Sequence, residues 1–168
     1  MQRRYATGHG DETTVLLSFL DEYRDAMVNK IQGLDEEQAR WAPTEQASSL
    51  LTLIVHLTQV EQGWMEGAVL GNEEVIRHLQ PLSDLFHDRD PKFYELVDRT
   101  TVAKAVEAYL AQCERTNEIA RGLDLDQPCK ADAGLSVRWV LLHVLVETSR
   151  HAGHADITRE LIDGAVGE

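Results

Sequence analysis

The side chains best suited to chemistry are three histidines and one glutamate near the end of the chain. His143, Glu147, His151 and His154 follow one another at spacings of 4, 4 and 3 residues. On a helix, with about 100° of rotation per residue, they fall within an arc of roughly 80° and share one face. Imidazole and carboxylate groups gathered in this way can bind a divalent metal ion or transfer protons.

This stripe overlaps the edge of an apolar helix face that must turn toward the core, formed by residues such as Val140 and Val144. Burying an unpaired carboxylate costs several kcal/mol, so Glu147 must be neutralised, paired or bound to a metal ion. His56 occupies an apolar arc of a second predicted helix, between Leu53 and Val60. A second imidazole is therefore expected to face the core.

We interpret His56, Glu147 and His151 as the ligands of a divalent metal ion. Two histidines and one carboxylate with an open fourth position form a ligand set typical of catalytic zinc, and imidazole sites also suit nickel and iron. In the alternative interpretation no metal is bound: Glu147 pairs with a neighbouring histidine or with Arg150, and His56 is a hydrogen-bonded core residue.

Two further histidines of the stripe have less defined roles. His154 lies one turn from His151, so it either replaces Glu147 as a ligand or orients the site and transfers protons. His143 lies one turn before Glu147, and we assign it a core or supporting role. Zinc is the first choice of metal, with nickel and iron as alternatives.

Four long amphipathic patterns must position these residues. They cover residues 13–32, the run from the Ser48-Ser49 cap to Gly71, the run from the Thr101 cap to Gly122, and the run from the Ser136 cap to Gly164, with a bend or break expected at Gly153. Each spans roughly 30–40 Å, and matched lengths are typical of a four-helix bundle. Because no segment alternates with period two, the sequence predicts an all-α, four-helix bundle formed by one domain, residues 1–168.

A long connector separates the second and third predicted helices. Residues 72–100 contain Pro81 and Pro91 and show weaker periodicity, although Asp90-Pro91 followed by KFYELVDR predicts a capped short helix. Structureless connectors of this length are unusual in compact domains. We therefore expect it to cross the bundle or to cover part of it.

Composition excludes several classes of protein. The 168 residues include 16 Lys and Arg against 29 Asp and Glu, a formal net charge of −13, and the basic residues are scattered. A surface with this excess of negative charge repels phosphate backbones, which argues against nucleic-acid binding.

No signal peptide or membrane-spanning run is visible, so the cytoplasm is the default location. Cys113 and Cys129 are expected to be free thiols.

Two segments carry a resemblance to a known family. Residues 48–71 and 137–164 resemble the signature stretches of the DinB-like superfamily, and more narrowly of its mini-circle protein branch. With the length and helix order added, the resemblance covers essentially the whole chain. It is specific at Ser49-Leu50-Leu51, His56-Leu57, Glu61, Trp64 and the run from Glu147 to Asp156.

The resemblance implies a four-helix bundle with a metal centre, which by position would be His56, Glu147 and His151. Many members have histidine in place of Glu147, whereas the related mycothiol-dependent maleylpyruvate isomerases are similar to this chain in having glutamate. His154 falls where many members have glutamine. A homodimer is also implied.

The implied activity is that of a metal-dependent transferase that activates a low-molecular-weight thiol of the mycothiol or bacillithiol type for attack on a small-molecule substrate. A hydrolase that uses metal-bound water is the nearest variant. The alternative is a non-enzymatic, stress-related or small-molecule-binding dimer, with a structural metal or an internally paired His/Glu stripe.

Overall fold

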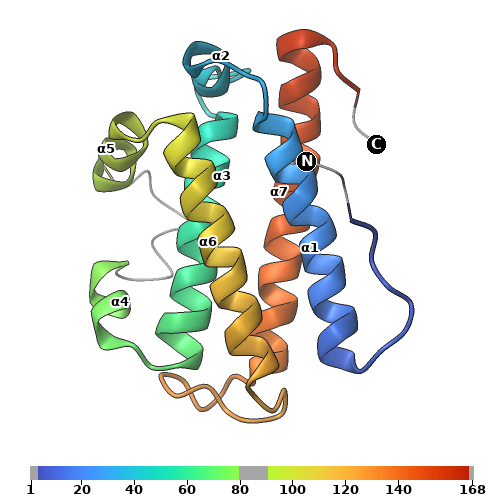
Figure 1. Cartoon of the computed structure of the whole chain (residues 1–168). Helices are drawn as coiled ribbons and strands as arrows, with labels where there is room; N and C mark the ends of the chain where they lie inside the picture. The colour runs from blue at the N-terminus through green and yellow to red at the C-terminus, as the bar shows by residue number, and fades with distance from the viewer. Residues whose placement is uncertain (1–3, 80–90, 167–168) are drawn as a thin grey trace.

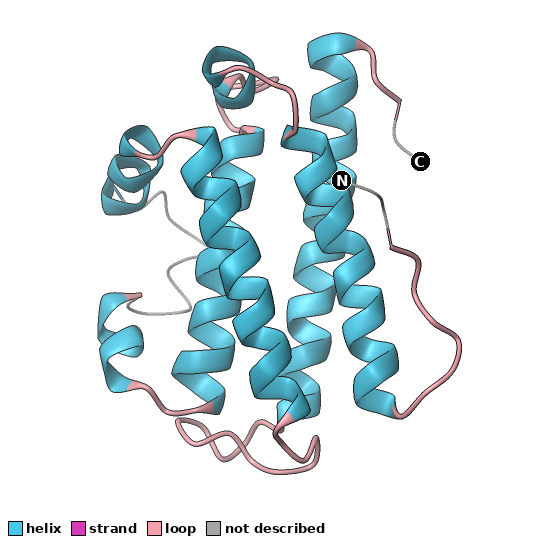
Figure 2. Cartoon of the chain, in the orientation of Figure 1, coloured by secondary structure: helices cyan, strands magenta, loops and turns pink. Residues whose placement is uncertain are grey.

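Four long helices lie side by side in the computed structural model, which describes residues 4–79 and 91–166 (Figure 1). Within these residues the chain forms only helices and loops, apart from one isolated bridge between Pro128 and Ser136 (Figure 2). The predicted all-α, four-helix bundle is confirmed. Its long helices are α1 (Glu12–Ile31), α3 (Leu50–Glu61) with its extension η1 (Gln62–Val69), α6 (Val102–Arg121) and α7 (Val137–Asp163).

Each long α-helix begins at a polar cap. The side chains of Ser49, Thr101 and Ser136 each accept a hydrogen bond from the backbone N–H three residues later, as their predicted capping roles require. Asp11 caps α1 in the same way. At the other end of α7, Gly164 adopts a left-handed conformation with φ of 76°, which glycine accepts without a steric penalty.

Two features of the long helices differ from the prediction. The break at Gly153 does not occur, because α7 continues as one helix through it, held by the buried Ala152 and Ala155 on either side. A single glycine costs a helix only about 1 kcal/mol, which this packing offsets. The second predicted helix is not α-helical throughout, because after Glu61 it widens into the π-helix η1, an arrangement often found at functional sites.

Three short helices flank the bundle: α2 (Glu36–Arg40), α4 (Glu73–His78) and α5 (Pro91–Arg99). The predicted helix after Pro91 is confirmed as α5, whereas its proposed cap at Asp90 lies outside the described residues. Helices α2 and α4 were not predicted from the sequence. Arg40 at the end of α2 donates hydrogen bonds to the carbonyl oxygens of Val97 and Thr100. These bonds connect α2 to the C-terminal end of α5.

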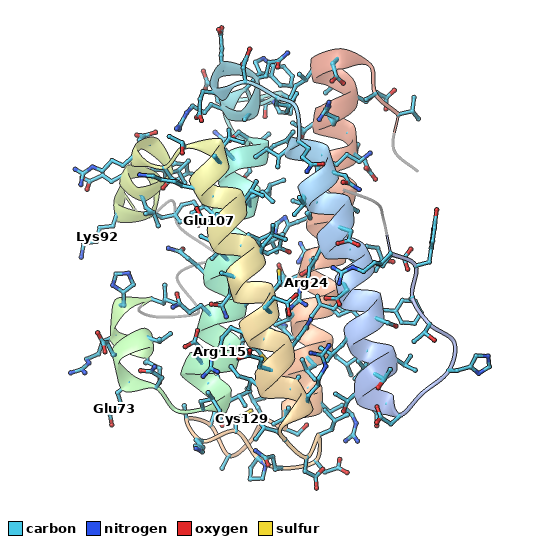
Figure 3. All side chains as sticks on the ribbon, viewed as in Figure 1. Arg24, Glu73, Lys92, Glu107, Arg115 and Cys129 are labelled. Atoms are coloured by element: carbon cyan, nitrogen blue, oxygen red, sulfur yellow. The ribbon has the colours of Figure 1, made fainter. Side chains whose placement is uncertain are left out.

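The helices pack in a ring, with α1 against α7, α7 against α3, α3 against α6 and α6 against α1. The buried side chains form two apolar clusters, one containing Met27, Leu57 and Tyr109 and the other containing Leu20 and Met65. The interior also contains a set of buried polar side chains. Figure 3 shows one of its members, Arg24, directed into the interior of the bundle. The set includes Arg24, Glu61, Thr116, Asn117, Glu147 and Thr148.

Two other predictions concern the described residues. Cys113 and Cys129 are both free, as expected, and both are buried. A search of the described helices finds none long and apolar enough to cross a membrane.

Candidate metal centre

Helices α3 and α7 bring together the three residues predicted as metal ligands. His56, Glu147 and His151 each offer a ligand atom, and these atoms lie within 4.8 Å of one another. Glu147 and His151 are one turn apart on α7, and His56 reaches them from the apolar face of α3. Residues separated by about ninety positions in the sequence therefore form one cluster.

Glu147 is also held by a cation. Its side chain is only 9% exposed, and its Oε1 accepts a hydrogen bond of 3.0 Å from Nη1 of Arg150. The other oxygen, Oε2, lies 3.5 Å from Nε2 of His151. The pairing expected in the alternative without a metal is thus present, although it engages only one carboxylate oxygen with the exposed guanidinium.

The histidines of the cluster are held in the neutral form. Burial, together with a smaller effect of the neighbouring His151, lowers the pKa of His56 to about 4. The two rings have centroids 4.9 Å apart, and Phe93 of α5 approaches His56 edge-on with centroids 6.5 Å apart. Burial also lowers the pKa of His151, against the opposing effect of Glu147. Neutral imidazole is the form that binds metal ions.

The cluster fits a divalent ion in donor type and in spacing. Four-coordinate zinc, with bonds of about 2.0–2.1 Å, places its ligand atoms about 3.4 Å apart, so small rotations of these side chains suffice. Nδ1 of His151 is buried and has no hydrogen-bond partner within the described residues. A buried nitrogen lone pair or N–H without a partner is costly, and a metal ion bound at this nitrogen would remove that cost.

The remaining two histidines of the stripe lie outside the three-residue cluster. His154 is exposed, with its ring centroid 5.6 Å from that of His151, so it is beside the cluster and on its solvent side. His143 is stacked against Trp139 with ring centroids 5.0 Å apart and contacts Trp64 at 4.7 Å. Burial lowers its pKa. His143 therefore packs among aromatic rings, and its core or supporting role stays a prediction.

Sequence reasoning missed a second polar cluster that lies inside the bundle. Arg24 donates hydrogen bonds to both carboxylate oxygens of Glu61, and through Nη1 to Asn117 and Asp21 at 2.8 Å each. Burial opposes the positive charge on Arg24, but Glu61 more than offsets this effect and raises its pKa. The available signal was an arginine at an inward position of α1, between Leu20 and Met27.

Phe93 was also missed, since only the tertiary fold brings α5 to His56. No pattern within the connector indicates that contact.

The bundle, the helix order and the two-helix His/Glu/His cluster define a DinB-like helical bundle protein. A family model described as mycothiol S-transferase matches residues 15–164, which include all four long helices and the whole cluster. The chain belongs to this family. A search of curated proteins found no match.

Proposed function

We propose that this protein is a metal-dependent transferase that joins a low-molecular-weight thiol, mycothiol, to an electrophilic small molecule. The observation that carries the proposal is the convergence of His56, Glu147 and His151 within 4.8 Å. The identity of the thiol is inferred from the family, whose description names mycothiol. When bound, a zinc-like ion would lower the pKa of a thiol at its open position toward neutrality.

The chain itself would bind the ion, restrict its surroundings and receive the thiol proton. His56 and His151 offer neutral nitrogens, and Glu147 offers one negative charge, so the ion keeps a net positive charge that favours a thiolate. Phe93 shields the His56 side of the cluster. His154, on the exposed side, is placed to accept the thiol proton and pass it to water.

The reaction then consists of one bond made and one bond broken. The thiol sulfur attacks an electrophilic carbon of the second substrate and forms a C–S bond, while the leaving group departs with the bonding electron pair. His154 takes no part in the new bond, so its replacement should slow the reaction without preventing metal binding.

Metal content provides the first test. The untagged wild-type protein, purified without chelators and loaded with Zn²⁺, should retain about one equivalent by mass spectrometry. His56→Ala and His151→Ala should each lose it. His78→Ala is the matched control, because His78 is an exposed histidine of α4 and its removal should leave the metal content unchanged.

Activity provides the second test. Mycothiol and a chromogenic aryl halide should form a thioether in the presence of the loaded wild-type protein, and His56→Ala should reduce the rate to background. A loaded protein that retains its metal but accelerates neither thioether formation nor hydrolysis would support the non-enzymatic alternative. A wild-type protein that takes up no metal would refute the metal centre itself.

A further inference from the structure

Arg150 of α7 lies at the edge of the candidate metal centre, between the cluster and solvent. Its Nη1 donates a hydrogen bond of 3.0 Å to Oε1 of Glu147, while 62% of the Arg150 side chain is exposed. Burial is the main cause of the lowered pKa of His151, and the positive charge of Arg150 adds to it. The guanidinium is therefore close to two of the three residues that would bind the ion, and it can be reached from solvent.

Most of the hydrogen-bonding capacity of Arg150 is unused. A guanidinium carries five N–H groups, and those on Nε and Nη2 form a fork that matches the two oxygens of a carboxylate. The bond to Glu147 engages only Nη1, and the Nε and Nη2 groups donate to no residue that the structure describes. The fork is therefore available to a ligand.

Other arginines of this acidic chain bind two carboxylates each. Arg138 donates hydrogen bonds to Glu12 and Asp126, and Arg4 likewise donates to two aspartates. Carboxylates are abundant, since the chain contains 29 Asp and Glu against 16 Lys and Arg. Arg150 differs because it engages one oxygen of one carboxylate and leaves its fork open beside the cluster.

The helix surface next to Arg150 has room for a small molecule. Gly153 lies three residues later, about one turn along α7, and is exposed. A Cβ atom added at Gly153 would meet nothing within 4 Å. Val146, one turn before Arg150, is 53% exposed. A molecule that approaches the fork therefore finds open space on one side and an apolar side chain on the other.

From this geometry we propose that Arg150 forms a carboxylate-binding subsite and that the electrophilic substrate is a small organic acid. This inference rests on the proposed function and adds the chemical class of the second substrate. An acid held by the fork has its carbon skeleton next to Glu147 and His151. Because reacting atoms must approach within about 3–3.5 Å, an anchor beside the cluster favours the attack of the thiol sulfur.

A matched pair of aryl halides tests the subsite in the Zn²⁺-loaded protein, with mycothiol as the thiol. Chloronitrobenzoate carries a carboxylate, and chloronitrobenzamide carries a neutral amide of similar size. In both reactions a C–S bond forms and the C–Cl bond breaks, chloride leaves with the electron pair, and the thiol proton passes to water. Arg150→Gln should lower the ratio of kcat/KM for the benzoate to kcat/KM for the benzamide at least about tenfold, mainly through KM of the benzoate.

Two further variants sharpen this comparison. Arg150→Lys keeps the charge without the fork, so it should restore only part of the ratio. Arg115→Gln is the matched control and should leave the ratio unchanged. Arg115 also forms an i,i+3 ion pair, with Glu118, but both partners are exposed and lie on α6, which contributes no residue to the cluster.

The kinetics also identify which substrate carries the carboxylate. If Arg150 binds the electrophile, as proposed, Arg150→Gln should leave KM of mycothiol close to the wild-type value. A ratio of benzoate to benzamide that Arg150→Gln does not change would overturn the proposal. A rise in KM of mycothiol in place of KM of the benzoate would overturn it as well, because the guanidinium would then bind the thiol.

Binding of unreactive analogues separates this proposal from the proposed function. Nitrobenzoate and nitrobenzamide are titrated into the metal-free protein by calorimetry. Nitrobenzoate should bind more tightly, and Arg150→Gln should weaken its binding at least about tenfold. This result in a protein that forms no thioether would refute the proposed function but support the subsite. Equal affinity of the wild type and Arg150→Gln for nitrobenzoate would overturn the subsite.

Discussion

Two buried polar clusters on the same helix of this bundle differ in how their charges are balanced. The Arg24 cluster joins α1, α3 and α6 and contains its own cation, which is hydrogen-bonded to Glu61, Asn117 and Asp21. The His56 cluster joins α3 and α7 and contains two neutral imidazoles, a carboxylate and a buried ring nitrogen without a partner within the described residues. The first cluster contains a buried cation, whereas the only cation that touches the second within the described residues is the mostly exposed Arg150, which engages one oxygen of Glu147.

The comparison separates a structural polar cluster from one that can bind a ligand. A closed ion pair contributes specificity of packing, and nothing remains for it to bind. An open set of neutral and negative donors is costly until an ion fills it, and this cost favours binding. His56 and Glu61 are only five positions apart on α3, so this difference comes from the helices that each side chain meets.

The largest expected effect comes from breaking the closed cluster. Arg24→Met should lower the free energy of unfolding by about 3–5 kcal/mol, because it leaves the Glu61 carboxylate buried without a cation. Chemical denaturation measures this change. The double variant Arg24→Met/Glu61→Leu should recover much of the loss, since both charges are then removed. A single variant as stable as the wild type would show that the pair is not structurally required.

The next effect is a pH dependence of the metal-free protein. The unfolded chain protonates His56 at its ordinary pKa near 6.5, whereas the folded chain resists protonation until about pH 4. The stabilising contribution is complete above pH 6.5 and should decrease as the pH falls toward 4, by up to about 3 kcal/mol. Denaturation curves at several pH values measure it. His56→Gln should flatten this part of the curve, and an unchanged slope would contradict the assignment.

Metal addition should stabilise the open cluster and leave the closed one unaffected. At a Zn²⁺ concentration of about 100 times Kd, binding to the folded state alone adds about 2.7 kcal/mol. Thermal unfolding with and without Zn²⁺ should show this increase in the wild type and in Arg24→Met. His56→Ala should show none. An equal increase in His56→Ala would place the metal elsewhere.

The smallest expected effect comes from replacing Arg150, the cation that is paired with Glu147 of the His56 cluster. Arg150→Gln should change the free energy of unfolding by less than about 1 kcal/mol, because the Arg150 side chain is mostly exposed to solvent. Its metal content should stay near one equivalent, since the guanidinium is not a ligand. Loss of the metal in this variant would instead show that Arg150 holds Glu147 in its binding position.

Much of the architecture could be predicted because it depends on local rules. The period of apolar residues and the caps at Ser49, Thr101 and Ser136 are enough to locate the long helices. The unbroken passage through Gly153 and the π-helix after Glu61 could not be predicted, because they depend on packing between helices. Local helix propensity contains no information about those contacts.

The sequence by itself determined the ligand types and their spacing, since residues at i and i+4 share a helix face wherever that helix lies. The sequence thereby placed Glu147 and His151 on the same face of one helix and His56 on the inward face of another. Only the tertiary structure decided that His56 meets this pair while Glu61 meets Arg24, because helix pairing sets distances between residues far apart in the chain. The physical reason is that periodicity fixes the direction of a side chain, whereas packing fixes its partner.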